Sequence, residues 1–134
     1  MSGTIHEHDP PIEVVTAIIR HDGKVLLTRR REGTHLAGFW EFPGGKAHPG
    51  ESMEAALIRE VREEIGVRIK VGSLIDEETH TYTDRTVHLH FFNAHIVEGT
   101  PRPMGVADLV WAFPSQLDRY DLPPANARVV EQLR

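Results

Sequence analysis

Cysteine is absent from the 134-residue chain, and this absence excludes several kinds of chemistry at once. A disulfide framework, a cysteine nucleophile and a zinc–thiolate site all require this residue. A basic excess is also lacking, since 15 lysine and arginine residues stand against 20 aspartate and glutamate residues, for a net charge of −5. Broad nucleic-acid binding requires a basic surface, so we expect no stable nucleic-acid complex.

Long apolar runs are missing too. No hydrophobic segment approaches the roughly 18 residues that a membrane-spanning helix needs, and the N-terminus lacks a signal-peptide pattern. These absences favour a cytoplasmic protein without membrane attachment. The length of 134 residues suits one domain with a modest core, as a monomer or a homodimer.

The order of apolar segments predicts one α/β domain over residues 12–134, after a flexible polar tail at residues 1–11. Strands are expected where apolar residues cluster, at residues 13–20, 24–29, 67–76, 87–97 and 109–113. His21, Asp22 and Gly23 provide the turn between the first two of them. Prolines open a final helix at residues 123–133.

A central helix is expected between a good N-cap, Ser52, and a glycine stop, Gly66. At about 100° per residue, its glutamates Glu60, Glu63 and Glu64 fall within an arc of roughly 100°. Three carboxylates this close repel each other, and a hard cation such as Mg²⁺ or Mn²⁺ removes that cost. The alternative is a solvated acidic face balanced by neighbouring arginines.

A glycine-containing loop, residues 40–46, precedes this helix. Gly44 and Gly45 let the backbone turn sharply and approach a ligand closely, and an exposed carbonyl there can ligate a metal. Lys46 is placed to meet a phosphate, or is simply solvated. Trp40 and Phe42 either stack on a base or belong to the core, and the sequence leaves both possibilities open.

The stretch from Gly45 to Val67 resembles the Nudix box, G-x5-E-x7-R-E-U-x-E-E-x-G-U, where U is a bulky aliphatic residue. The matching positions are Gly45, Glu51, Arg59, Glu60, Val61, Glu63, Glu64, Gly66 and Val67. The resemblance implies the Nudix fold, an α/β/α sandwich with a mixed central β-sheet, and hydrolysis of a phosphoric anhydride bond.

The same resemblance implies a role for each matching site residue. The Gly44 carbonyl and the carboxylates of Glu60, Glu63 and Glu64 would hold Mg²⁺, for which Mn²⁺ can substitute. Glu60 would also act as the general base, and Arg59 would orient these carboxylates.

Residues outside the box resemble the MutT-type nucleoside triphosphate pyrophosphohydrolases. In that branch an asparagine in a motif like Leu122-Pro-Pro-Ala-Asn126 reads an oxidised guanine, because a carboxamide offers both a donor and an acceptor. Asn126 would then read the base. The implied pocket is lined by Arg30, His35, Glu41 and Phe42, with Lys46 offsetting phosphate charge. Judged without the family, Asn126 is a helix-start residue.

One position departs from the MutT pattern. Enzymes of that branch often carry another acidic metal ligand six residues before a tryptophan, and counting back from Trp111 gives Gly105. Asp108 or Glu98 could replace it from nearby. The departure leaves open a nucleotide-binding or regulatory module that kept the fold and lost efficient catalysis.

His88 and His90 form a weaker signal. Strand alternation places both on one face, with Val87, Leu89 and Phe91 on the other. Two such histidines either bind a transition metal or form a polar, partly buried sheet face, and one of them could also meet a base or phosphate.

Together these features predict a Mg²⁺-dependent enzyme whose partner is a small nucleoside triphosphate, cleaved to the monophosphate and pyrophosphate. The Asn126 motif favours 8-oxo-dGTP. The alternative is a sister branch that hydrolyses CTP, dCTP and modified cytidine nucleotides and has a similar hairpin and His-Leu-His strand. A dinucleotide or nucleotide sugar suits the short chain less well.

Overall fold

A computed structural model describes residues 10–134 of the chain. The flexible tail predicted for residues 1–11 therefore falls largely outside the described residues. The strands are β1 (Ile12–His21), β2 (Lys24–Arg29), β3 (Trp40–Glu41), β4 (Gly44–Lys46), β5 (Arg68–Thr81), β6 (Thr86–Glu98) and β7 (Asp108–Ala112). The helices are α1 (Met53–Ile65) and α2 (Ala127–Leu133), with 3₁₀ segments η1 (Pro114–Arg119) and η2 (Pro124–Asn126).

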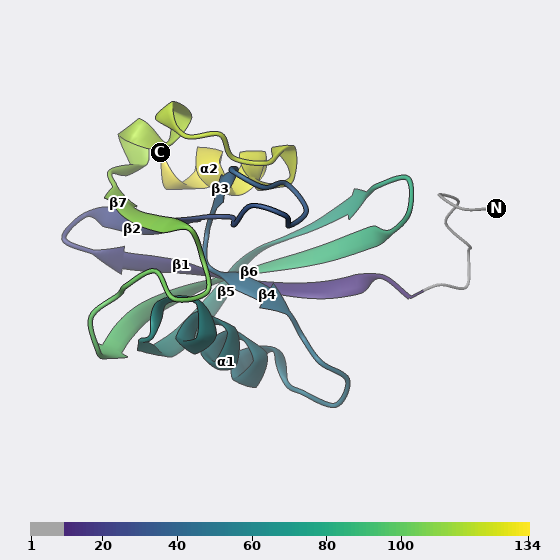
Figure 1. The fold of residues 1–134 in the computed structure, drawn as a ribbon, viewed down its shortest axis with the longest axis horizontal. Coiled ribbons are helices and arrows are strands. Elements are labelled where there is room, and N and C mark those ends of the chain that lie inside the picture. Colours follow the sequence, from purple (N-terminus) through teal and green to yellow (C-terminus); the bar gives the residue numbers. More distant parts are fainter. Residues whose placement is uncertain (1–9) are drawn as a thin grey trace.

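A mixed sheet lies between two helical layers, with α1 on one side and α2 with the 3₁₀ segments on the other (Figure 1). The strand order is β3-β2-β1-β6-β5, while β4 pairs with β1 and β7 pairs with β2. The long strands β1 and β6 pair in parallel. This arrangement confirms the predicted α/β/α sandwich with a mixed central sheet.

The hairpin between β1 and β2 also agrees with its prediction. Arg20 lies opposite Val25 in an antiparallel register. The turn residues Asp22 and Gly23 have φ values of 50° and 76°. Positive φ at both central residues is the condition for a two-residue turn whose twist matches that of the flanking strands.

Helix α1 begins and ends at the predicted caps. The Ser52 side chain accepts a hydrogen bond from the Ala55 N–H at 3.1 Å, which satisfies one of the free N–H groups at the helix start. Gly66 adopts a left-handed conformation with φ of 73°, and its N–H donates to the Arg62 carbonyl. Both ends of the acidic segment are therefore fixed by local sequence.

Two hydrophobic clusters lie on opposite faces of the sheet. Along β1, Val15, Ala17 and Ile19 belong to the cluster that includes the buried residues of α1, whereas Ile18 belongs to the second. Alternation along the strand produces this division. The first cluster contains Ala56, Leu57, Val61 and Ile65 of the helix, all fully buried. Their burial, at about 1.5–3 kcal/mol for a large aliphatic side chain, holds the helix and leaves its glutamates at the border of the core.

The structure corrects the sequence prediction at several places. Residues 40–46 were expected to form a loop, but β3 pairs with β2 and β4 pairs with β1. Strands of two or three residues carry no periodicity and are defined only by their partners. The final helix, predicted over residues 123–133, begins as the η2 turn and becomes α-helical only at Ala127. Over residues 10–134, no helix is both long and apolar enough to cross a membrane.

Candidate active site

Gly44 and Gly45 bring the β4 backbone against β1 and α1. A Cβ atom on Gly44 would lie 2.0 Å from the Val15 carbonyl oxygen, and one on Gly45 would lie 2.4 Å from Glu60 Oε2. Both separations are far shorter than a van der Waals contact. Glycine at these two positions therefore lets the loop approach the carboxylate of Glu60 directly.

Glu64 has a carboxyl group that is partly buried between the helix and the glycine strand. The Gly44 N–H donates to Glu64 Oε1 at 2.9 Å. Burial raises the pKa of Glu64 to about 8; the Gly44 hydrogen bond opposes this shift, and the charges of Glu41 and Glu60 reinforce it. Without a nearby cation, burial therefore favours the protonated form of Glu64 at neutral pH.

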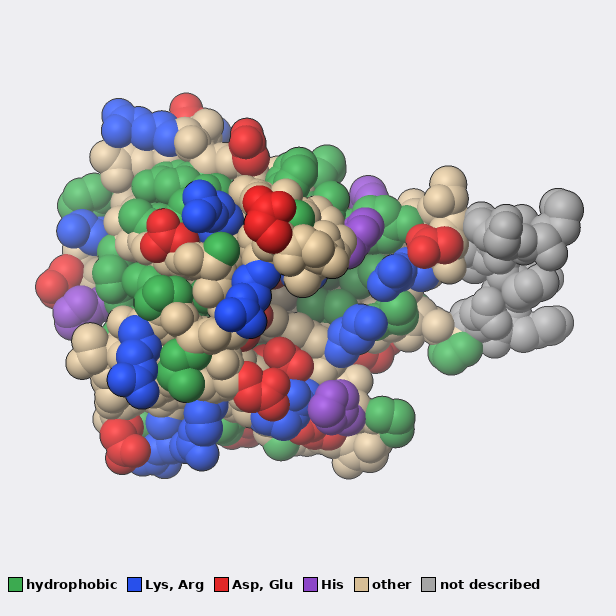
Figure 2. Space-filling model, viewed as in Figure 1, with side chains coloured by type: hydrophobic (Ala, Val, Ile, Leu, Met, Phe, Trp, Pro, Cys, Tyr) green, Lys and Arg blue, Asp and Glu red, His purple; other side chains and the backbone are tan. Residues whose placement is uncertain are grey.

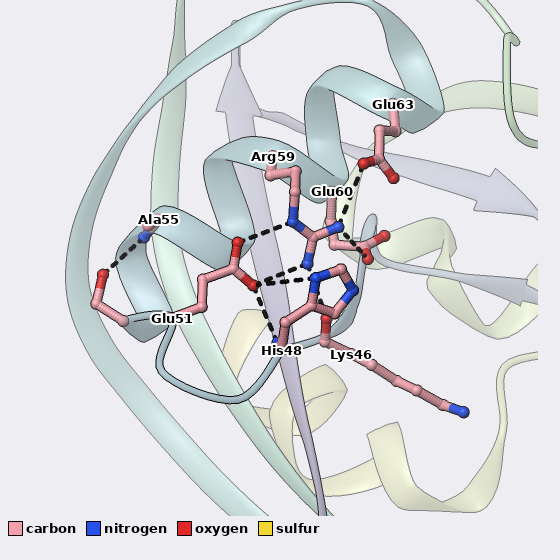
Figure 3. A network of polar contacts seen from close by, with 8 residues as sticks. Lys46, His48, Glu51, Ala55, Arg59, Glu60 and Glu63 are labelled. Carbon is pink, nitrogen blue, oxygen red and sulfur yellow. Dashed lines mark hydrogen bonds and ion pairs between the residues drawn. The ribbon is translucent and has the colours of Figure 1, made fainter.

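Arg59 connects the acidic residues around this loop (Figure 3). Its Nε and Nη2 atoms donate to the two oxygens of Glu51 at 2.8 and 2.9 Å, and Nη2 also donates to the Lys46 carbonyl at 3.0 Å. Its Nη1 atom donates to Glu60 at 2.9 Å and to Glu63 at 3.3 Å. The Arg59 hydrogen bonds lower the pKa of Glu51 to about 2. The two bonds to Glu51 fix the guanidinium where it reaches Glu60.

The donor set fits a divalent cation in chemistry. Carboxylate and carbonyl oxygens are the ligands that hard cations prefer. Glu60 and Glu63 already share one positive group, the Arg59 guanidinium, and a positive charge would also favour ionisation of Glu64. The three carboxylates do not all approach one another within 4.8 Å. The Glu63 side chain is 59% exposed and so has room to turn toward the others.

A cavity of about 390 Å³ lies beside this group. Its lining combines the acidic helix and its loop with the far C-terminal segment: Gly44, Gly45, Lys46, Glu60, Glu64, Pro123, Ala125 and Asn126. Strand residues Val14, Thr16, Val87 and Leu89 also line it. The volume falls within the range typical of small-molecule sites.

Arg30, His35 and Glu41 are brought together at this cavity, as the resemblance implied. Arg30 Nη1 donates to both Glu41 oxygens at 2.9 and 3.3 Å, and Arg30 Nε donates to the His35 carbonyl. Burial raises the pKa of Glu41, and the Arg30 charge and hydrogen bonds partly offset that rise. The cavity thus contains a fixed ion pair next to the metal-binding candidates.

Asn126 is 5% exposed and contributes to the cavity lining. It stands at the end of η2, directly before α2, and its side chain makes no capping hydrogen bond to that helix. Within residues 10–134, its side-chain amide nitrogen makes one hydrogen bond, a long one of 3.4 Å to the Pro123 carbonyl. Asn126 is therefore a helix-start residue by position, while its carboxamide remains free to meet a ligand.

The structure places the remaining predicted residues, Phe42 and Lys46, differently with respect to the cavity. Phe42 is 2% exposed in the second hydrophobic cluster and is not part of the cavity lining. Its core interpretation therefore agrees with the structure better than a stacking role. Lys46 is exposed, and its side chain points away from the Arg59 network (Figure 3). Tyr82 and Arg85, near the turn between β5 and β6, line the cavity although nothing in the sequence singled them out.

Gly105 packs against the end of α1. Its N–H donates to the Glu64 carbonyl at 2.9 Å, and a Cβ atom there would lie 3.0 Å from the Glu63 carbonyl oxygen. Neither Glu98 nor Asp108 lines the cavity. Asp108 instead accepts a hydrogen bond from the next N–H along the chain, that of Leu109. The backbone at this position supports the acidic helix without adding a carboxylate.

An α/β sandwich with an acidic helix, a close-packed glycine strand and a shared cavity suits an enzyme that binds a small molecule together with a cation. The sequence model of the NUDIX domain matches residues 14–132. The chain is 41% identical over 120 residues to the CTP pyrophosphohydrolase of Escherichia coli K12, covering 90% of this chain and 89% of that protein. It is 33% identical over 124 residues to the 8-oxo-dGTP diphosphatase of the same organism, covering 92% and 96%.

Solved structures agree with this assignment. The crystal structure of the MutT protein from Methanosarcina mazei Go1 superposes with a TM-score of 0.85 at 28% identity, covering 96% of each chain. The chain belongs to the Nudix family and is a Nudix hydrolase.

Proposed function

We propose that the protein hydrolyses a nucleoside triphosphate to the monophosphate and pyrophosphate in the presence of Mg²⁺. The observation that carries this proposal is the shared cavity, which Glu60 and Glu64 line together with Asn126. Acidic groups suited to a metal–phosphate complex and a free carboxamide suited to a base thus face one space. A nucleotide satisfies this arrangement, because it carries phosphates and a base in one molecule.

Glu60, Glu63, Glu64 and the Gly44 carbonyl would hold the cation. Oxygen-only donors suit Mg²⁺, and Mn²⁺ suits the same set. When bound, the cation supplies charge that neutralises the phosphates and makes a nearby water more acidic. Arg30, Lys46 and Arg85 also line the cavity and can balance the remaining negative charge.

Glu60 would remove the proton from the attacking water. The water oxygen forms a new bond to phosphorus, the phosphoric anhydride bond breaks, and pyrophosphate leaves as the second product. Arg59 would act as a positioning residue, since its hydrogen bond to Glu60 and its pair with Glu51 hold that carboxylate beside Gly45. Proton removal by a placed carboxylate contributes about 10²- to 10⁴-fold.

Asn126 would read the base, and its chemistry favours an oxidised purine over guanine. Guanine presents two acceptors, N7 and O6, on its major-groove edge. In 8-oxoguanine, N7 carries a hydrogen, so the edge offers a donor beside an acceptor and matches a carboxamide. The role would be cytoplasmic removal of 8-oxo-dGTP from the nucleotide pool, which limits mutation.

Cytidine triphosphates are the second candidate, supported by the 41% identity to a CTP pyrophosphohydrolase over 90% of this chain. Cytosine also presents a donor, its amino group, beside an acceptor, so the same carboxamide can pair with it. The chemistry of the phosphates would be unchanged. The two candidates therefore differ in the fit of the base and, for CTP, of the sugar.

The deciding experiment measures kcat/KM in Mg²⁺ for 8-oxo-dGTP, dGTP, dCTP and CTP, with pyrophosphate and phosphate release recorded separately. Preference for 8-oxo-dGTP over dGTP, with pyrophosphate as product, supports the first candidate. Preference for the cytidine nucleotides supports the second. Tight nucleotide binding without turnover on any of the four overturns the proposed catalysis and favours a regulatory module.

A further inference from the structure

A second group of metal-binding side chains lies outside the cavity. Glu13 of β1 stands opposite His88 of β6 in the parallel register, and His90 follows two residues along β6. Their neighbours Ile12, Val14, Val87 and Leu89 line the cavity, whereas none of these three residues does. Alternation therefore points Glu13, His88 and His90 to the face of the sheet opposite these neighbours.

The three side chains converge on one point. His90 Nε2 lies 2.7 Å and His88 Nδ1 lies 3.3 Å from the same atom, Glu13 Oε1. One ligand atom from each residue lies within 4.8 Å of the other two. Two imidazoles and one carboxylate are a common ligand set for Zn²⁺, which takes nitrogen and oxygen ligands at about 2.0–2.2 Å.

Glu77 supplies the support that a metal-binding histidine usually has. Its Oε1 atom lies 3.0 Å from Nδ1 of His90, a ring that is 2% exposed. A hydrogen on Nδ1 would be donated to Glu77 and would leave the lone pair of Nε2 directed at Glu13. Such a carboxylate–histidine pair fixes the tautomer that ligates metal through Nε2.

The contact between Nε2 and Glu13 brings two potential metal-ligand atoms together. In neutral imidazole only one ring nitrogen carries a hydrogen, yet both nitrogens of His90 face carboxylate oxygens. A hydrogen on either atom satisfies the 2.7 Å contact between His90 Nε2 and Glu13 Oε1, and so does a cation beside both atoms that binds one lone pair of each. The presence of His88 beside the same oxygen, with its ring 4.4 Å from that of His90, favours the cation.

We propose that Glu13, His88 and His90 form a binding site for a divalent transition metal, with Zn²⁺ preferred, and that Glu77 orients His90. The side chains of His88 and Glu13 are 34% and 37% exposed, which leaves access for the ion and for a water as a further ligand. The bound ion would join β1 to β6 near the start of β1. The site is independent of the nucleotide activity, because it shares no residue with the cavity.

The test is calorimetric titration of Zn²⁺ into the full-length protein, in excess Mg²⁺ to occupy the acidic helix. His6 and His8 are replaced by glutamine in every sample, since both can bind metal. We expect one equivalent of Zn²⁺. Affinity should fall at least about tenfold in His88→Gln and Glu13→Gln, and about tenfold in Glu77→Gln. Circular dichroism establishes that each variant is folded.

His95→Gln is the matched control, because His95 is an exposed histidine on the same strand. Its affinity for Zn²⁺ should equal that of the parent. Co²⁺ absorption gives an independent readout, since nitrogen ligands in a four-coordinate site produce stronger visible bands than an all-oxygen octahedral site. Absence of a Zn²⁺ equivalent, or an equivalent lost in Glu60→Gln but retained in His88→Gln, overturns the proposal.

Discussion

Gly44 and Glu64, 20 residues apart in the chain, are joined by a hydrogen bond of 2.9 Å from the Gly44 N–H to Glu64 Oε1. This bond connects the glycine strand to the acidic helix. It also holds a partly buried carboxyl group whose pKa burial raises to about 8, although the hydrogen bond itself opposes that rise. The relationship thus keeps a carboxyl group whose ionisation is unfavourable at the lining of the cavity.

Glu64→Gln should stabilise the metal-free protein. The ordinary pKa of a glutamate is 4.5 and that of folded Glu64 is about 8, so between these values the unfolded state loses its proton first. Stability of the parent therefore falls as pH rises through this window. The variant avoids this loss, so its free energy of unfolding should exceed that of the parent by on the order of 1–3 kcal/mol near pH 7. Thermal unfolding in EDTA at pH 4.5 and pH 7 measures the difference.

Addition of Mg²⁺ provides the control for this stability effect. The parent should gain melting temperature when Mg²⁺ is added, because a ligand that binds only the folded state stabilises it. The variant should gain less. If the melting temperatures of parent and variant in EDTA differ by the same amount at pH 4.5 and pH 7, burial of the Glu64 carboxylate is not the cause of the stability difference.

Glu60→Gln should abolish most turnover without loss of folding. Glutamine keeps the shape of the side chain and cannot accept the proton, so kcat should fall by at least about 10²-fold. Glu54→Gln, at an exposed glutamate in the first turn of the same helix, is the matched control and should keep the parental rate. If Glu60→Gln also keeps that rate, another residue is the base.

Local sequence was sufficient to predict the parts of the structure that depend on near neighbours. The caps of α1 follow from Ser52 and Gly66, and the β1–β2 turn follows from Asp22 and Gly23. The separation of the β6 histidines from Val87 and Leu89 follows from alternation alone, whereas only the structure shows that the cavity lies on the side of Val87 and Leu89. The fold class itself was predicted correctly because each of these elements agreed with the layered arrangement.

The features of the site that the sequence did not reveal depend on contacts between residues far apart in the chain. Arg85 reaches the cavity from the β5–β6 hairpin, and an arginine near a turn resembles any solvated surface residue. The bond between Glu51 and Arg59 joins residues eight apart, whereas neighbours on a helix face are three or four apart, and Glu51 lies before the helix begins. Phe42 lies in the connection between β3 and β4, and its contacts with the second hydrophobic cluster, not any local pattern, place it in the core. On the face seen in Figure 2, acidic and basic side chains are mixed and form no continuous basic surface.

Arg128→Gln should destabilise the protein at neutral pH and much less in acid. Arg128 donates to both Asp76 oxygens at 2.9 and 2.8 Å, joining α2 to β5. These hydrogen bonds lower the pKa of Asp76 below its usual 3.8. The stabilisation is therefore present above pH 3.8 and is lost as the pH falls through the lowered value. The melting temperature of the variant should lie below that of the parent at pH 7, and the difference between the two should shrink in increasingly acidic buffers.

The matched control for the α2 contact is Arg134→Gln, which removes an exposed arginine paired with Glu131 on the same helix. Exposed pairs of this kind contribute little, so its melting temperature should stay close to that of the parent. A constant difference between Arg128→Gln and the parent down to strongly acidic pH would contradict the role of Asp76.

Asn126→Asp should shift the choice of base. The carboxylate retains acceptors and loses the amide donor, so the O6 atom of 8-oxoguanine loses its partner and meets a negative charge. The amino group of cytosine still finds an acceptor. We expect kcat/KM for 8-oxo-dGTP to fall about 10- to 100-fold, with a smaller fall for dCTP.

Asn93→Asp, on β6 and hydrogen-bonded to Arg20, is the matched control and should leave both values unchanged. Because the expected result is the ratio of the two efficiencies, it applies whichever nucleotide the parent prefers. Equal falls for both nucleotides would mean that Asn126 supports the fold of the C-terminal segment and does not read the base.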